Sequence, residues 1–140
     1  MPRLALLCCV LCLLVPSTLN AQGVLVVSQN KCALDKQGQL RQTNDSLWIP
    51  IAQELVNEGK LTAAGSAYHA WGDEWNVVIW YTAANTQAFF AAFGELIARV
   101  NQRHPGLIAQ FQSWCSEHKD SMYSQGRSTT PSPAAAPRDD

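Results

Sequence analysis

Residues 61–81 have the pattern of a β-hairpin whose two faces are both largely apolar. Gly72 and Asp73 supply the turn, because glycine at the first central position of a two-residue loop is what a type II′ turn requires. This turn sets a register in which large aromatic residues of the second strand lie opposite small partners. The predicted pairs include Ala64 with Tyr81, Gly65 with Trp80, His69 with Asn76, Ala70 with Trp75 and Trp71 with Glu74.

The register divides the hairpin residues between two faces, and each apolar face must pack against another part of the protein or a partner. We assign to the helices the face with Ala64, Ser66, Tyr68, Ala70, Trp75, Val77, Ile79 and Tyr81. The open side carries Leu61, Ala63, Gly65, Ala67, His69, Trp71, Asn76, Val78, Trp80 and Thr82. The second face is open because its polar side chains need water or a cavity to satisfy them. A slip of one residue would exchange part of the two sets.

Two helices flank the hairpin. Apolar residues at spacings of three and four between Leu40 and Leu55 mark the first, and Pro50 leaves its start open: the helix begins near Asp45 or Ser46, or it begins near Gly38 and is distorted at the proline. Gly59 is its expected C′ residue. The second helix is capped by Asn85, has an apolar stripe from Phe89 to Val100, and stops at His104-Pro105-Gly106. A short helical stripe follows from Leu107 to Cys115.

The order of elements predicts an α+β fold. Residues 24–32 form a buried strand, and 118–123 form an edge strand. Strand, helix, two strands, helix and strand make the split βαβ, or ferredoxin-like βαββαβ, arrangement: an antiparallel four-stranded sheet with helices on one face. We expect the other face to form a homodimer, because Trp71, Val78 and Trp80 would leave an exposed apolar patch on a monomer.

The ends of the chain have a different composition from this domain. Arg3, the apolar run from Leu4 to Val15 and the breaking Pro16 predict a secretory signal peptide over residues 1–21, with an anchoring helix as the alternative. Twelve apolar residues are too few to span a bilayer. The domain then covers 22–123, and residues 124–140, rich in Pro, Ser and Ala, form a disordered tail. The predicted location is the periplasm or the exterior, with no stable membrane association after cleavage.

The cysteines and the net charge give further information on the compartment and the partners of the protein. Cys32 and Cys115 remain after cleavage, and an even pair in an oxidising compartment suggests a disulfide, with two separate buried thiols as the alternative. The predicted topology brings the end of the first strand near the start of the last, where these cysteines lie. Loss of Arg3 changes the formal charge from 10 − 11 = −1 to 9 − 11 = −2, without any basic run, which argues against nucleic acid as a partner.

At this point the segments carry a resemblance. VSQNKCAL, LWIPIAQELVNEGK, AYHAWGDEWNVVIWY, FFAAFGELIARV and HKDSMY, in this order, resemble the dimeric α+β barrel superfamily, which includes antibiotic-biosynthesis monooxygenases and stress-responsive A/B-barrel proteins. The resemblance implies the fold and a dimer. Activities within that superfamily range from cofactor-free oxygenation and haem chemistry to none known, so it implies no single reaction. No catalytic set carries over residue by residue.

Candidate chemistry is sparse. His69, on the open face beside Asn76, is a candidate proton shuttle or ligand donor, or else a hydrogen-bonded structural residue. His118 and Asp120 share one face of the last strand, a spacing that suits a carboxylate-oriented imidazole or an ordinary polar edge. Trp71 and Trp80 suit stacking on a flat ligand or packing in a core. No metal-ligand spacing, phosphate loop or nucleophile elbow occurs, so neither a cofactor nor a metal is predicted.

Two functions follow from these residues. The first is a small apolar or aromatic ligand bound in a pocket on the open sheet face, lined by His69, Trp71, Asn76 and Trp80, with cofactor-free oxygenase chemistry as one form of it. The second is a non-catalytic exported dimer whose aromatic face is only a subunit interface. The space around His69 discriminates between them, because a cavity favours the first and a packed interface the second.

Overall fold

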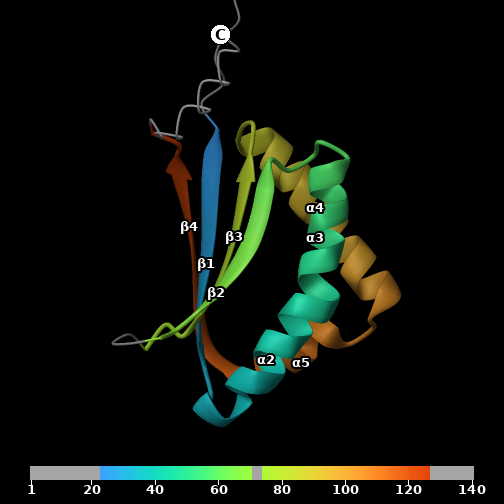
Figure 1. Cartoon of the computed structure of the whole chain (residues 1–140). Helices are drawn as coiled ribbons and strands as arrows, with labels where there is room; N and C mark the ends of the chain where they lie inside the picture. Colours follow the sequence, from blue (N-terminus) through green and yellow to red (C-terminus); the bar gives the residue numbers. More distant parts are fainter. Residues whose placement is uncertain (1–22, 71–73, 127–140) are drawn as a thin grey trace, which may run out of the picture.

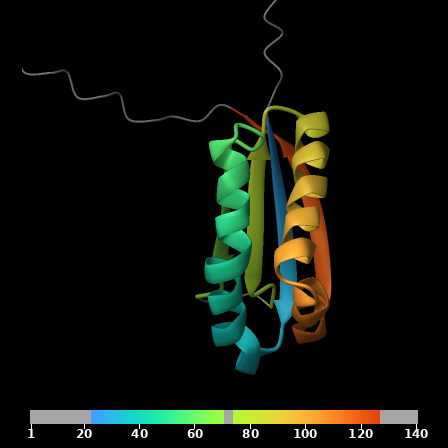
Figure 2. The same ribbon diagram turned by 90° about the vertical axis from the view of Figure 1, so that its right-hand side faces the viewer.

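The computed structural model describes residues 23–70 and 74–126, which form one four-stranded sheet covered on one side by helices. The strands are β1 (Val24–Cys32), β2 (Ala63–Tyr68), β3 (Val77–Ala83) and β4 (Cys115–Ser124). Their order is β2-β3-β1-β4 and every neighbouring pair is antiparallel. Figure 1 shows all helices on one side of this sheet, and Figure 2 shows α3 and α4 running side by side in front of it. The ferredoxin-like α+β prediction is confirmed.

The first helical region begins early and changes pitch before its proline. A 3-10 turn, η2 (Leu34–Lys36), leads into α2 (Gln37–Thr43), a π-helical segment, η3 (Asn44–Trp48), and α3 (Ile49–Asn57). Of the two predicted starts, the one near Gly38 is correct. Pro50 has no N–H to donate to a preceding turn, and the helix takes the wider π pitch in the segment that ends two residues before it.

The predicted helix ends are confirmed by their hydrogen bonds. Gly59 has φ 72°, its N–H donates to the Val56 carbonyl at 2.9 Å, and the Lys60 N–H donates to the Leu55 carbonyl at 2.9 Å. These two bonds are a Schellman motif, which favours glycine at this position. At the start of α4 (Thr86–Arg103), the Asn85 Oδ1 accepts from the Ala88 N–H at 2.8 Å. A short helix, α5 (Leu107–Trp114), follows.

The hairpin has the predicted register. Gly65 pairs with Trp80 and Ala64 with Tyr81, and the His69 N–H donates to the Asn76 carbonyl at 2.9 Å. A Cβ on Gly65 would lie 2.5 Å from the Trp80 ring, so the small partner is a steric requirement. The turn at 71–73, with its type II′ geometry and the pairing of Trp71, lies outside the described residues.

Burial on β3 confirms which face meets the helices. Val77, Ile79, Tyr81 and Ala83 are buried against the helices, whereas Val78, Trp80 and Thr82 are half-buried on the opposite side.

Trp75 was expected on the helix-facing side, and this is wrong. It precedes β3, and the Lys119 ammonium lies 4.6 Å from its ring centroid. Lys119 pairs with Gln29 in the row that points away from the helices.

A disulfide joins the two strands that the topology brings together. Cys32 and Cys115 are bonded, with their Cα atoms 3.8 Å apart and a separation of 83 positions in sequence. This confirms the predicted bridge and excludes the alternative of two separate thiols. The last strand is longer than predicted, because β4 begins at Cys115 and includes Ser124, which was assigned to the tail. The predicted signal peptide and nearly all of the predicted tail lie outside the described residues.

Candidate ligand-binding cavity

The structure contains a cavity of about 620 Å³ between the sheet and the helices. Its floor is the helix-facing side of β1, β3 and β4, and its roof comes from α4 and α5, with Trp48 from η3 at its side. The predicted pocket was on the open sheet face. This cavity lies on the opposite face of the sheet, so the residues that line it are not those of the predicted pocket, and the open-face pocket stays a prediction.

Aromatic side chains form one end of the cavity. Phe89 and Phe93 stack with their ring centroids 5.5 Å apart, and Tyr81 meets Phe93 edge-on at 5.8 Å. Phe90 and Met122 line the cavity too, and both are exposed, at 61% and 39%. The apolar end is therefore open to solvent between α4 and β4.

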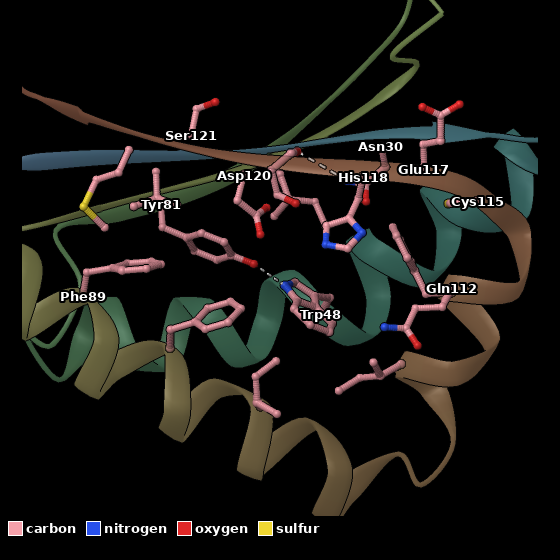
Figure 3. A pocket seen from close by; sticks show the side chains of 18 of the residues that line it. Asn30, Trp48, Tyr81, Phe89, Gln112, Cys115, Glu117, His118, Asp120 and Ser121 are labelled. Carbon is pink, nitrogen blue, oxygen red and sulfur yellow. Dashed lines mark hydrogen bonds between the residues drawn. The ribbon is translucent and has the colours of Figure 1, made fainter.

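A hydrogen bond between the half-buried Trp48 and the buried Tyr81 lies in the middle of the cavity. The Trp48 Nε1–H donates to the Tyr81 hydroxyl at 2.7 Å, as Figure 3 shows. Burial raises the pKa of the Tyr81 phenol above its ordinary value of 10.0, the Trp48 hydrogen bond opposes this rise, and the negative charge of Asp120 adds to it. Tyr81 therefore stays protonated, and its own O–H remains a donor for a ligand.

His118 and Asp120 bring polar groups to the same space from β4. They pair with Asn30 and Ser28 of β1, so they share the helix-facing row, as predicted. Figure 3 shows both side chains pointing into the cavity, whereas Glu117 and Ser121 point away from it. Among the described residues, no hydrogen bond or ion pair joins His118 to Asp120, so this structure does not contain the oriented imidazole that the spacing suggested.

The open-face candidates lie elsewhere. His69, Asn76 and Trp80 do not line the cavity, and Trp71 lies outside the described residues. Asn76 is 3% exposed and binds the Cys32 backbone twice: its Oδ1 accepts from the N–H at 2.8 Å, and its Nδ2 donates to the carbonyl at 2.7 Å. These bonds hold the turn end of the hairpin against the end of β1, which is a structural task. His69 is half-buried.

Sequence reasoning placed Trp48, Tyr81, Phe89 and Phe93 in the core and did not identify them as a site. One signal was available. Trp48 and Tyr81 both belong to sets assigned to the helix–sheet interface, and a buried indole and a buried phenol each need a hydrogen-bond partner. Two such side chains in the same helix–sheet layer indicate a polar contact inside that layer.

Metal sites and membrane-spanning helices are both absent from the described parts of the chain. Within residues 23–70 and 74–126, no group of three or more His, Cys, Asp or Glu side chains is placed to hold a metal ion. No helix in those same ranges is long and apolar enough to cross a membrane.

Comparisons with known proteins identify the fold. No protein-family model matches the chain, and no curated protein sequence matches it. A NIPSNAP family protein from Agrobacterium tumefaciens is similar in structure, with a TM-score of 0.62, 13% identity, and 75% of this chain and 87% of that chain covered. A NIPSNAP-like domain protein from Burkholderia xenovorans has a TM-score of 0.62 and 13% identity over 86% and 99% of the two chains.

A third solved structure is a dimeric ferredoxin-like protein from an uncultured marine organism. It matches with a TM-score of 0.61 and 8% identity over 79% of this chain and 92% of that chain. At such identities the likeness is one of fold. The fold that the resemblance implied is confirmed, and this chain has the ferredoxin-like α+β fold that these proteins share.

Proposed function

We propose that this chain is an exported homodimer in which each subunit binds a small apolar or aromatic molecule in the cavity between the sheet and helices α4 and α5. The observation that carries the proposal is the cavity itself. Its volume of about 620 Å³ lies in the range of small-molecule sites, and its lining is mainly apolar and aromatic with a few convergent polar groups.

The polar groups make one part of the cavity chemically different from its aromatic end. A ring bound near Phe89 and Phe93 has the Tyr81 hydroxyl and the Asp120 carboxylate beside it, and His118 further along β4. A ligand with one polar substituent on an aromatic body can satisfy both ends at once. A wholly apolar ligand would take water away from the polar groups without replacing its hydrogen bonds.

The dimer uses the other face of the sheet. Leu25, Val27, Val78 and Trp80 are half-buried there, and no described helix covers them. Such a continuous apolar surface favours an interface, and one of the similar solved proteins is described as dimeric. Export is supported by the Cys32–Cys115 disulfide, because structural disulfides persist in oxidising compartments.

A second candidate function, cofactor-free oxygenation, uses the same cavity. It is favoured by the imidazole of His118, which points into the cavity and could take a proton from a bound phenol. Oxygen consumption with phenolic ligands, compared between the protein and His118→Ala, tests this chemistry separately from binding.

Titration with Nile red, a neutral aromatic dye that carries one carbonyl group, tests the binding proposal. Met122→Trp places a larger ring at the exposed mouth of the cavity and should weaken dye binding at least about tenfold. Leu34→Trp is the matched control, because Leu34 is 76% exposed in η2 and does not line the cavity. Equal dye affinity for the protein and Met122→Trp would contradict the proposal.

A further inference from the structure

We propose that the ligand of this cavity is an aromatic or alicyclic amine, whose ammonium group lies against the Asp120 carboxylate while its ring packs among the phenylalanines. This inference rests on the proposed binding function and adds to it the charge of the ligand. It follows from which charged groups line the cavity and which of them already have partners.

The charge that points into the cavity is negative. Besides Tyr81, the charged and titratable residues that line the cavity are Glu117, His118 and Asp120, and none of its lining residues is lysine or arginine. Glu117 points away from the cavity, and its carboxylate lies 3.5 Å from the Lys31 ammonium on the other face of the sheet. Asp120, itself exposed to solvent, therefore supplies the negative charge that faces the cavity.

Asp120 has no counter-ion in the described parts of the chain, 23–70 and 74–126. The nearest lysine in sequence, Lys119, points to the opposite face, where its ammonium lies over the Trp75 ring. A bound ligand removes water from this carboxylate, and a carboxylate that loses water needs a cation or several donors in return. An ammonium group supplies one positive charge and three donors.

The neighbours of Asp120 suit an ammonium group as well. The Tyr81 oxygen accepts one hydrogen bond from Trp48 and keeps a lone pair for a second donor. Ser28, the pairing partner of Asp120 on β1, lines the cavity and adds another hydroxyl acceptor. The faces of aromatic rings, here Tyr81 and Phe93, attract cations in addition.

The same groups disfavour anions. A carboxylate or phosphate ligand would meet the negative Asp120 without any lysine or arginine among the lining residues to pair with it. A neutral aromatic ligand fits the apolar end but leaves Asp120 partly dehydrated and unpaired. The order of affinity expected from the lining is amine, then neutral alcohol, then carboxylate.

Three naphthalene probes with the same ring and different charge test this order. Calorimetric titration of the disulfide-bonded protein should show 1-naphthylmethylamine binding about tenfold more tightly than 1-naphthalenemethanol, with 1-naphthoate weakest. In Asp120→Asn the amine should bind no more tightly than the alcohol, whereas the affinity for the alcohol stays within about twofold. That unchanged alcohol affinity also reports that the variant is folded.

Asp35→Asn is the matched control, because it removes the same charge from exposed η2, away from the cavity, and should keep the preference for the amine. Equal binding of amine and alcohol by the protein, or a preference for the amine that persists in Asp120→Asn, would overturn the charge assignment and leave the binding function standing. Tightest binding of naphthoate would overturn it too. If none of the three probes bound, both proposals would fail.

Discussion

Strands β3 and β4 both turn one row of side chains toward the helices, but the helices seal only the row on β3. Val77, Ile79 and Tyr81 on β3 are 0%, 6% and 2% exposed, whereas Met122 on β4 is 39% exposed. β3 is an inner strand with β2 and β1 on either side, and β4 is at the edge. The cavity lies where the roof formed by α4 and α5 passes over the polar row of the edge strand. A site arises here because one strand is left partly uncovered.

The disulfide has the largest expected effect on this comparison, since it joins the start of β4 to β1 covalently. Replacing both Cys32 and Cys115 by alanine should lower the free energy of unfolding by about 4 kcal/mol, because an 83-residue separation greatly restricts the unfolded chain. Urea unfolding measures the loss, and hydrogen exchange should quicken more in β4 than in β3. A loss below about 1 kcal/mol would show that packing alone holds the edge strand.

Truncation of one side chain in each row sharpens the contrast. Ile79→Ala should cost about 3 kcal/mol of unfolding free energy, because Ile79 is buried in the core cluster and its neighbours close only partly over the space that it leaves. Met122→Ala should cost less than about 1 kcal/mol, because the Met122 side chain is already open to water. Urea unfolding of the two variants under the same conditions compares the rows directly. Similar losses would mean that β4 is packed as tightly as β3.

How far the sequence predicts this contrast depends on the range of the interactions. The hairpin register could be predicted because it depends on close neighbours: the side chains of a strand alternate between its two faces, and Gly65 leaves room for Trp80. The shared row of His118 and Asp120 follows from strand periodicity for the same reason.

The place of the cavity could not be predicted in this way. It depends on how far α4 and α5 lie from β4, a distance that is set by packing between segments remote in sequence. Trp75 was misplaced for a related reason. The strand pattern continues through Asn76 in the sequence, but Asn76 instead binds the backbone of Cys32, and β3 begins only at Val77.

The third prediction compares the two faces of the sheet. Val78→Lys places a charge on the half-buried face away from the helices, and it should raise the dimer dissociation constant at least about thirtyfold, because a buried charge without a partner opposes association. Sedimentation at several concentrations measures the change. Ala109→Lys adds the same charge on exposed α5 and should leave the dimer intact. A protein that sediments as a monomer before any substitution would contradict the proposed interface.

The smallest expected effect concerns the carboxylates between α3 and α4. They form ion pairs, whereas Asp120 at the cavity forms none within the described ranges. Glu58 of the α3 C-cap accepts two hydrogen bonds of 2.8 Å from Arg99 of α4, and Lys60 lies at 2.8 Å from it. The Arg99 hydrogen bonds, followed by the one from Lys60, lower the pKa of Glu58 from 4.5 to about 2. Glu54 and Glu95, which also bind Arg99, have lowered pKa values as well.

A carboxylate whose pKa is lower in the folded state stabilises the fold above its ordinary pKa of 4.5, and this contribution disappears as the pH falls from 4.5 to about 2. Glu58→Gln should therefore lose less stability than the unmodified protein over that range, while the two differ little in high salt, because exposed ion pairs are screened. Urea midpoints measured between pH 6 and pH 2 give both slopes. Identical slopes of stability against pH for the two proteins at low salt would contradict this prediction. The ion pairs of Glu58 would then contribute nothing to holding α3 and α4 together over β3. The difference between β3 and β4 would in that case depend on apolar packing alone.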